Sequence, residues 1–173
     1  MFSENQNKIL NLFFEFPSGK FHIRDISRRV ELNPNTVLNI VNQLVKDKLL
    51  IREKKPHLVE IRANIDEKFI RLKRIYNLNR IYENGFIEFL MNKFSPESIS
   101  LIGSYSRGED VEESDIEIVI ITKKEYETLS LLKFESKLKR KIHLIISDYK
   151  KLSDEFYINL INGIVLEGYL NKR

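Results

Sequence analysis

The chain has no cysteine and no tryptophan, and only four prolines and six glycines among its 173 residues. The missing cysteines exclude disulfides, thiolate catalysis and cysteine-based zinc sites. The three histidines, His22, His57 and His143, lie too far apart in the sequence to show metal-ligand spacing. No apolar run reaches the roughly 18 to 20 residues that a membrane helix needs, and the first residues lack the basic start of a signal peptide. We therefore expect a cytoplasmic protein that does not contact the membrane.

Charge is unevenly distributed along the chain. Residues 1–94 contain 17 Lys and Arg against 11 Asp and Glu, a net charge of +6, whereas residues 95–173 contain 12 against 14, a net charge of −2. The length suits one typical domain or two small ones, and the contrast in charge favours two. We predict an N-terminal domain over residues 1–64, a connecting helix over 65–94 and a C-terminal domain over 95–173.

The most informative segment lies in the C-terminal part. Gly103 and Ser104 follow an apolar, strand-like run and precede an expected helix start, where free backbone amides can receive phosphate oxygens. Asp115 and Glu117 lie two residues apart on an expected strand, so both side chains point to one side while the alternating isoleucines face a core. No Gly-Lys-Ser or Gly-Lys-Thr follows the turn, which excludes a P-loop. A β-turn before an amphipathic strand with solvated acids would give the same pattern.

This segment resembles the signature of the minimal nucleotidyltransferases of the DNA polymerase beta superfamily, which reads Gly-Ser-x-x-x-Gly and then Ser-Asp-x-Asp. The resemblance implies that Gly103, Ser104 and Arg107 bind the triphosphate of a nucleotide, with ATP as the expected one. It also implies that Asp115 and Glu117 bind Mg²⁺, which activates the attacking hydroxyl and stabilises the leaving pyrophosphate. A nucleoside monophosphate would pass to an acceptor hydroxyl, for example on a toxin-type protein partner. The matching residues are Gly103, Ser104, Arg107, Gly108, Ser114 and Asp115, with Glu117 in the second acidic place.

The third carboxylate of this family has no clear counterpart. Family members normally carry it on a later strand, and the corresponding strand here, residues 141–146, presents His143. A neutral histidine can act as a base but is a poor Mg²⁺ ligand, so His143 is either a catalytic residue or a polar residue at the edge of the core. Asp148 could substitute for the carboxylate or cap a following helix. The alternative function is therefore a non-catalytic transcription regulator whose nucleotidyltransferase fold serves as ligand sensor or dimerisation scaffold.

The N-terminal part predicts three helices and a β-hairpin. The first helix ends at Pro17 to Gly19, the second runs from about His22 to Glu31, and the third begins near Pro34. The third helix has an apolar face and a short, amide-rich face that suits hydrogen bonding to base edges. Two strand-like runs, 50–55 and 58–62, then form a hairpin with a basic tip. The candidate DNA-binding residues are Asn35, Thr36, Asn39, Asn42, Gln43, Lys46, Lys54, Lys55 and His57.

This order of elements resembles a winged helix-turn-helix domain, as found in many bacterial and archaeal transcription regulators. The resemblance implies that the third helix enters the major groove of double-stranded DNA, that the hairpin approaches phosphates, and that the protein acts as a homodimer on paired half-sites. A small helical domain for protein contacts is the alternative.

The remainder of the chain predicts a mixture of helices and strands. The connecting helix is expected to break or bend at Gly85. We expect an α/β (α+β) protein whose C-terminal mixed sheet is flanked by helices. The predicted C-terminal elements are strands at 99–102, 116–122 and 141–146 and helices at 106–109, 124–138 and 149–162.

Overall fold

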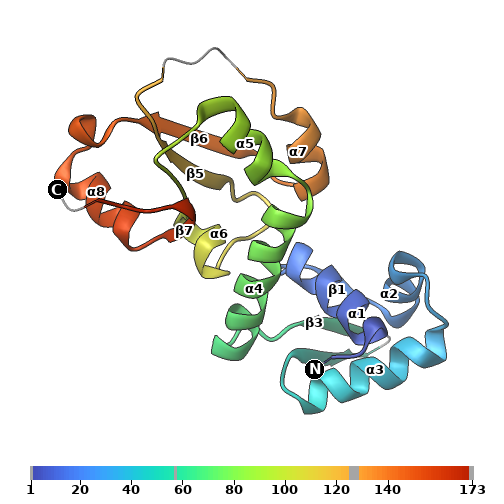
Figure 1. The fold of residues 1–173 in the computed structure, drawn as a ribbon. Helices are drawn as coiled ribbons and strands as arrows, with labels where there is room; N and C mark the ends of the chain where they lie inside the picture. Colours follow the sequence, from blue (N-terminus) through green and yellow to red (C-terminus); the bar gives the residue numbers. More distant parts are fainter. Residues whose placement is uncertain (1, 57, 125–128, 172–173) are drawn as a thin grey trace. The chain divides into compact units, whose positions relative to one another are not determined.

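The computed structural model describes residues 2–56, 58–124 and 129–171, which form two compact units, Met1–Tyr76 and Asn77–Arg173 (Figure 1). The division falls inside helix α4 (Glu67–Glu83), because Phe69 of this helix is buried in the first core and Ile81 in the second. The boundaries that we predicted at residues 64 and 94 stay a prediction. In the part of the chain that the structure describes, no helix is long and apolar enough to cross a bilayer.

Unit 1 contains three helices followed by an antiparallel hairpin. Asn33 caps the third helix by accepting a hydrogen bond from the Asn35 amide, and Pro34 occupies the first helical position, where its missing N–H costs nothing. The sheet order is β1-β3-β2. This is the winged helix-turn-helix arrangement predicted from the sequence. The elements are α1 (Glu4–Glu15), β1 (Lys20–Phe21), α2 (Ile23–Val30), α3 (Pro34–Lys46), β2 (Leu50–Lys55) and β3 (Leu58–Ala63).

The core of unit 1 confirms the predicted orientation of α3. Val37, Val41 and Leu44 are buried in the cluster that joins the three helices to the sheet, and Ile40 and Val45 are partly buried against it. The apolar stripe of this helix is therefore used for packing, which leaves its amide-rich face outward.

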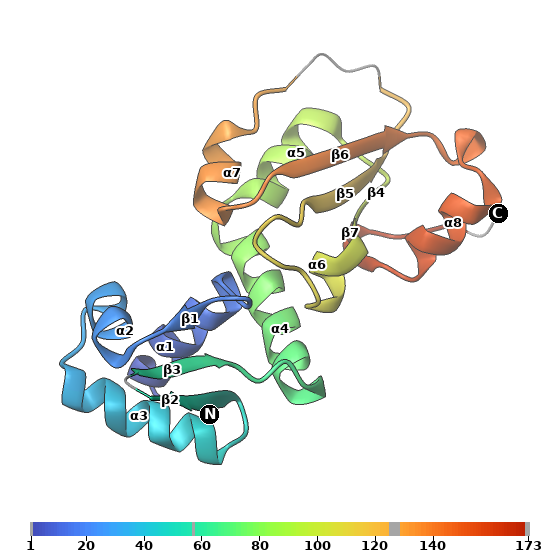
Figure 2. The same cartoon turned by 180° about the vertical axis from the view of Figure 1, so that it is seen from behind.

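Unit 2 is built on a mixed sheet with the order β6-β5-β4-β7, in which only the β5–β6 pair is parallel (Figure 2). The chain breaks at Gly85, as predicted, and a new helix begins after this residue. The α/β (α+β) class is confirmed. The elements after α4 are α5 (Phe86–Phe94), β4 (Ser98–Ile102), α6 (Gly103–Arg107), β5 (Ile116–Ile121), α7 (Leu132–Leu138), β6 (Ile142–Ser147), the 3-10 turn η1 (Tyr149–Lys151), α8 (Asp154–Ile161) and β7 (Ile164–Gly168).

Both faces of this sheet are covered. The alternating isoleucines of β5 pack with α5 and α7 on one face, as predicted, whereas Val119 and Ile121 pack with α8 and η1 on the other. Glu117 has the same parity as Val119, so it belongs to the face that carries α8, whereas Asp115 precedes the strand. Both acids lie at the beginning of β5.

Three predicted helices of unit 2 were wrong in extent. The helix expected over 106–109 is α6, which begins at Gly103 and ends at Arg107. The helix expected over 124–138 includes residues 125–128, outside the described part, and helix α7 begins only at Leu132. Leu129 and Leu131 pack against the same core cluster as α7, although neither residue belongs to a helix. The helix expected over 149–162 is divided, because Ser153 caps a separate α8 after the short η1.

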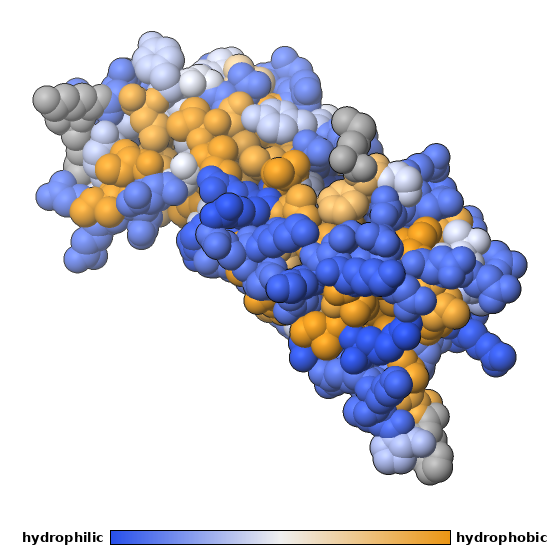
Figure 3. Space-filling view, turned by 90° about the horizontal axis from the view of Figure 1, so that it is seen from below, coloured by the Kyte–Doolittle hydropathy of each residue, from blue (hydrophilic) through white to orange (hydrophobic). Residues whose placement is uncertain are grey.

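Apolar side chains remain at the surface of unit 2 on α8 and β7, where Ile158, Ile161 and Val165 are each at least 40% exposed (Figure 3). Tyr82 borders this strand, since its hydroxyl donates to the Leu166 carbonyl over 2.8 Å. One backbone group of strand β7 is thereby satisfied by a side chain.

Candidate nucleotide-binding site and DNA interface

The glycine-serine turn connects a fully buried strand to a short helix. All residues of β4 are buried, and the chain turns directly into α6 at Gly103, which has φ +73°. The helix ends at Gly108, with φ +77°. Both positions use the left-handed region that glycine adopts at low cost, so the two glycines of the motif bound a single helical turn.

Glu117 lies directly over Gly103. A Cβ atom placed on Gly103 would meet the Glu117 Oε2 atom at 1.8 Å, so any side chain at this position would have to displace the Glu117 carboxylate. The strand register explains this approach, because Glu117 pairs with Ile102, the residue before the turn. The missing side chain of Gly103 therefore makes room for a carboxylate beside the turn.

The three predicted catalytic residues lie at or just before the beginnings of strands β5 and β6. His143 pairs with Glu117 in the parallel β5–β6 register, so the two side chains share one face. Asp115 is exposed and precedes β5, two residues before Glu117. His143 is also exposed, so it is not a core residue. Among the described residues, no group of three or more histidine and acidic side chains is arranged to hold a metal ion.

Asp148 is excluded as a nearby substitute for the third carboxylate. It follows the far end of β6, and its carboxylate accepts a hydrogen bond from the Lys150 amide over 3.1 Å. The capping role considered for this residue is confirmed.

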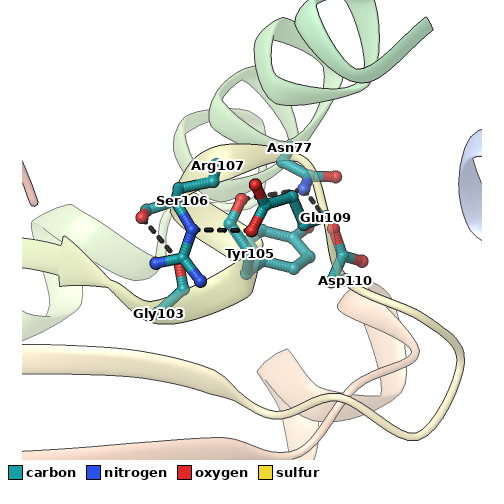
Figure 4. Close-up of polar contacts among 7 residues, drawn as sticks. All are labelled: Asn77, Gly103, Tyr105, Ser106, Arg107, Glu109 and Asp110. Atoms are coloured by element: carbon teal, nitrogen blue, oxygen red, sulfur yellow. Dashed lines mark hydrogen bonds and ion pairs between the residues drawn. The ribbon is translucent and has the colours of Figure 1, made fainter. Parts of the chain in front are cut away.

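The carbonyl groups of the turn accept hydrogen bonds from neighbouring residues (Figure 4). The Ser106 hydroxyl donates to the Gly103 carbonyl over 2.7 Å, and the Glu109 amide donates to the Ser104 carbonyl over 3.0 Å. The Tyr105 carbonyl accepts a hydrogen bond from the Asn77 side chain over 2.9 Å. These bonds fix the backbone of α6 independently of any ligand.

A comparison with protein families matches this part of the chain. The family model described as "Polymerase beta, Nucleotidyltransferase" matches residues 84–169. This part of the chain is a polymerase beta nucleotidyltransferase domain. The match covers the whole sheet, the glycine-serine turn and the acidic strand.

Two further comparisons do not contribute to the assignment of the family. A solved structure, "a MarR family protein from Bacillus stearothermophilus", is 20% identical, covers 53% of this chain and 67% of its own, and has a TM-score of 0.36. The winged-helix assignment rests on the order of helices and strands in unit 1. The search of curated proteins found no match.

Arg107 of the nucleotidyltransferase domain is exposed at the end of α6, where its Nε donates to the Glu109 carboxylate over 2.7 Å. An exposed ion pair of this kind contributes only about 0 to 1 kcal/mol, so Arg107 can exchange its partner for a phosphate. Asp115 also lines a hollow of about 650 Å³ with Ser114, Glu113 and Lys141. Charged groups of both signs thus surround the space next to the predicted metal ligand.

In unit 1, the predicted DNA-contacting face of α3 is present. The Asn42 Oδ1 atom accepts a hydrogen bond from Arg52 of the hairpin over 2.5 Å. Gln43 donates to Asp47 over 3.3 Å. Of the predicted residues on this helix, the exposed ones are Asn35, Asn39, Gln43 and Lys46, and the partly buried ones are Thr36 and Asn42.

The hairpin separates the two lysines that we predicted together. Successive residues of a strand point to opposite faces, and Arg52 reaches α3, so Lys54 shares the α3-facing side of the hairpin. Lys55 points to the other side and forms a 2.6 Å ion pair with Glu60. The hydrogen bond within this ion pair raises the pKa of Lys55 and lowers the pKa of Glu60. His57 lies outside the described residues.

Sequence reasoning missed four residues at these sites: Arg52, Asn77, Asp110 and Arg140. The first supports the face of α3, and the other three form a buried group behind α6. One signal was available for Asn77. It belongs to the buried stripe of α4, four residues before Ile81, where an apolar residue would be usual.

Proposed function

We propose that the protein binds double-stranded DNA through unit 1 and a magnesium-bound nucleoside triphosphate, most simply ATP, through its nucleotidyltransferase domain. The observation that carries the nucleotide site is the Glu117 carboxylate over Gly103, with His143 beside it, in a domain of this family. Gly103, Ser104 and Arg107 would contact the triphosphate.

The oxygen donors of Asp115 and Glu117 suit Mg²⁺, which is commonly held by one or two carboxylates together with substrate phosphates. When bound, the ion would neutralise charge on the phosphates and lower the barrier to displacement. A site with two protein carboxylates therefore depends on the nucleotide to complete the coordination. This fits the lack of a three-ligand cluster among the described side chains.

The proposed reaction is transfer of a nucleoside monophosphate. The acceptor oxygen forms a bond to the α-phosphorus, the bond to pyrophosphate breaks, and the hydroxyl proton passes to neutral His143. The acceptor would enter the hollow beside Asp115, whose charged lining suits a polar partner such as a side chain of a toxin-type protein. A positioned general base contributes about 10²- to 10⁴-fold to rate, so an enzyme that lacks the usual carboxylate base would be slow and not inactive.

Calorimetric titration of Mg-ATP and Mg-GTP into the full chain tests the nucleotide site. We expect binding to the wild type that is abolished by Asp115→Asn and by chelation of the metal. Asp148→Asn is the matched control, because this carboxylate lies at the opposite end of β6 and should leave the affinity unchanged. Absence of binding to the wild type would refute the proposal.

The second candidate function is a non-catalytic transcription regulator in which nucleotide is sensed rather than consumed. It is favoured by His143 at the position of the third carboxylate. Release of pyrophosphate in the presence of metal and candidate acceptors separates the two functions. Nucleotide binding without turnover would support the regulator, whether the fold acts as sensor or as the scaffold of a homodimer.

The proposed DNA contact is carried by the exposed amides of α3. The double variant Asn39→Ala with Gln43→Ala should relax base preference, because each bidentate amide contact to a base contributes about 1 to 3 kcal/mol of discrimination. Selection of bound duplexes from a random pool measures this preference, and sedimentation with a selected duplex reports whether a homodimer binds. An unchanged preference would exclude α3 as the reading helix.

A further inference from the structure

Behind the glycine-serine turn lies a buried polar group made of Asn77, Asp110 and Arg140, whose exposed fractions are 1%, 2% and 9%. The Asn77 amide nitrogen donates to the Tyr105 carbonyl over 2.9 Å and to Asp110 Oδ1 over 2.7 Å. Arg140 Nη2 lies 3.6 Å from Asp110 Oδ2. Figure 4 shows Asn77 and Asp110 meeting directly behind α6.

The chemistry of Asn77 is specific to this place. Its NH₂ group has two hydrogens, and one bond goes to a backbone carbonyl and the other to a carboxylate. An aspartate at position 77 would place an acceptor against the Tyr105 carbonyl and the Asp110 carboxylate, which are themselves acceptors. A leucine there would leave both groups without this donor. Burying an ion pair such as Asp110 with Arg140 also costs several kcal/mol of desolvation per ion, which is rarely a gain for stability alone.

The group lies next to the segments that carry the proposed residues of the nucleotide site. Tyr105 belongs to α6 with Gly103 and Ser104, Asp110 lies in the loop that leads to Asp115, and Arg140 precedes β6. The carbonyl of Lys141, the next residue, accepts a hydrogen bond from the Ile116 amide over 2.8 Å at the start of β5. One set of buried contacts thus joins the phosphate turn, the acidic strand and the strand of His143.

We infer that Asn77, Asp110 and Arg140 are positioning residues of the nucleotide site, holding the glycine-serine turn at the distance from β5 and β6 that the triphosphate requires. This inference rests on the proposed nucleotide binding. None of the three contacts the nucleotide; they act through the Tyr105 carbonyl and the loop before Asp115.

The test is the affinity of the full chain for Mg-ATP, measured by calorimetry well below the melting temperature of each variant. Asn77→Leu preserves size and removes both donors, and we expect the dissociation constant to rise about 10- to 100-fold, the usual effect of removing a residue that supports a ligand site. Asp110→Asn keeps the bond to Asn77 and removes the charge facing Arg140, so its effect should be smaller but measurable.

A matched control separates positioning from general loss of stability. Ile121 is buried at the far end of β5 from the acids, so Ile121→Val or Ile121→Ala can be chosen to equal the drop in melting temperature of Asn77→Leu. The control should bind Mg-ATP like the wild type, and all variants should retain DNA binding by unit 1.

The outcomes are distinguishable. A wild type that does not bind Mg-ATP would overturn the proposed function itself. If the wild type binds and Asn77→Leu binds no worse than the equally destabilised Ile121 variant, the positioning role is wrong. Should Asn77→Leu fail to fold, Asp110→Asn is judged by the same comparison.

Discussion

Gly103 shows how one missing side chain shapes this site. Its backbone requires a positive φ, and the space that a Cβ would fill is taken by the Glu117 carboxylate. The motif glycine therefore has two roles, since it permits the turn from β4 into α6 and it admits the carboxylate of Glu117, the proposed metal ligand, next to that turn. Only the second role belongs to the nucleotide chemistry.

We predict that Gly103→Ala abolishes metal-dependent nucleotide binding, because the new methyl group displaces the Glu117 carboxylate. The left-handed backbone adds a cost of about 1 to 2 kcal/mol for a non-glycine residue. Calorimetry with Mg-ATP and thermal unfolding measure the two effects separately.

Gly85 provides the control, since it has φ +76° and nothing within 4 Å of an added Cβ. Gly85→Ala should show the same order of destabilisation with unchanged affinity for Mg-ATP. Equal losses of affinity in both variants would mean that backbone strain, and not the position of Glu117, decides binding.

At the scale of elements, the hairpin of unit 1 shows the effect of strand alternation. Lys54 and Lys55 are neighbours in sequence, yet only Lys54 lies on the side of the hairpin that meets α3. Lys55 is engaged with Glu60 on the opposite side. The two lysines should therefore differ in their contribution to DNA binding.

Lys54→Ala is expected to weaken binding to any duplex and to reduce the slope of log affinity against log salt concentration by about 0.9, the value for one phosphate contact. Lys55→Ala, the matched control, should change the slope little. Fluorescence anisotropy at several salt concentrations gives both slopes. The opposite ranking would place the other face of the hairpin against the DNA.

On the scale of the whole molecule, α4 is the element that belongs to both units. Phe69 and Leu72 pack in the core of unit 1, and Leu78 and Ile81 pack in the core of unit 2. Each unit nevertheless has its own sheet and its own buried cluster. A ligand that binds one unit should therefore stabilise that unit first.

We predict two thermal transitions, of which Mg-ATP raises only the one that belongs to unit 2. At 100 times the dissociation constant the ligand contributes about 2.7 kcal/mol. Ile26→Ala identifies the transition of unit 1, because truncating this fully buried side chain costs about 2 to 5 kcal/mol. Calorimetric scans with and without ligand report both transitions. A single transition that shifts as a whole would show that α4 couples the units into one cooperative structure.

The sequence by itself determined the elements whose signals are local. Pro34 and the apolar spacing of α3 indicated that helix, Gly85 indicated the break after α4, and the alternating isoleucines indicated the core-facing side of β5. Each of these features depends on a single residue or on one hydrophobic periodicity. Such a signal can be recognised in the sequence without knowing which elements pack together.

Only the tertiary structure decided which distant residues meet. The register between β5 and β6 set His143 beside Glu117, and the fold brought Asn77 and Arg140 to Asp110, 33 and 30 positions away. The start of α7 also depended on packing, since Leu129 and Leu131 reach the same core cluster without belonging to the helix. Contacts between segments depend on the sheet order and on the space between layers, and no local pattern records either of them.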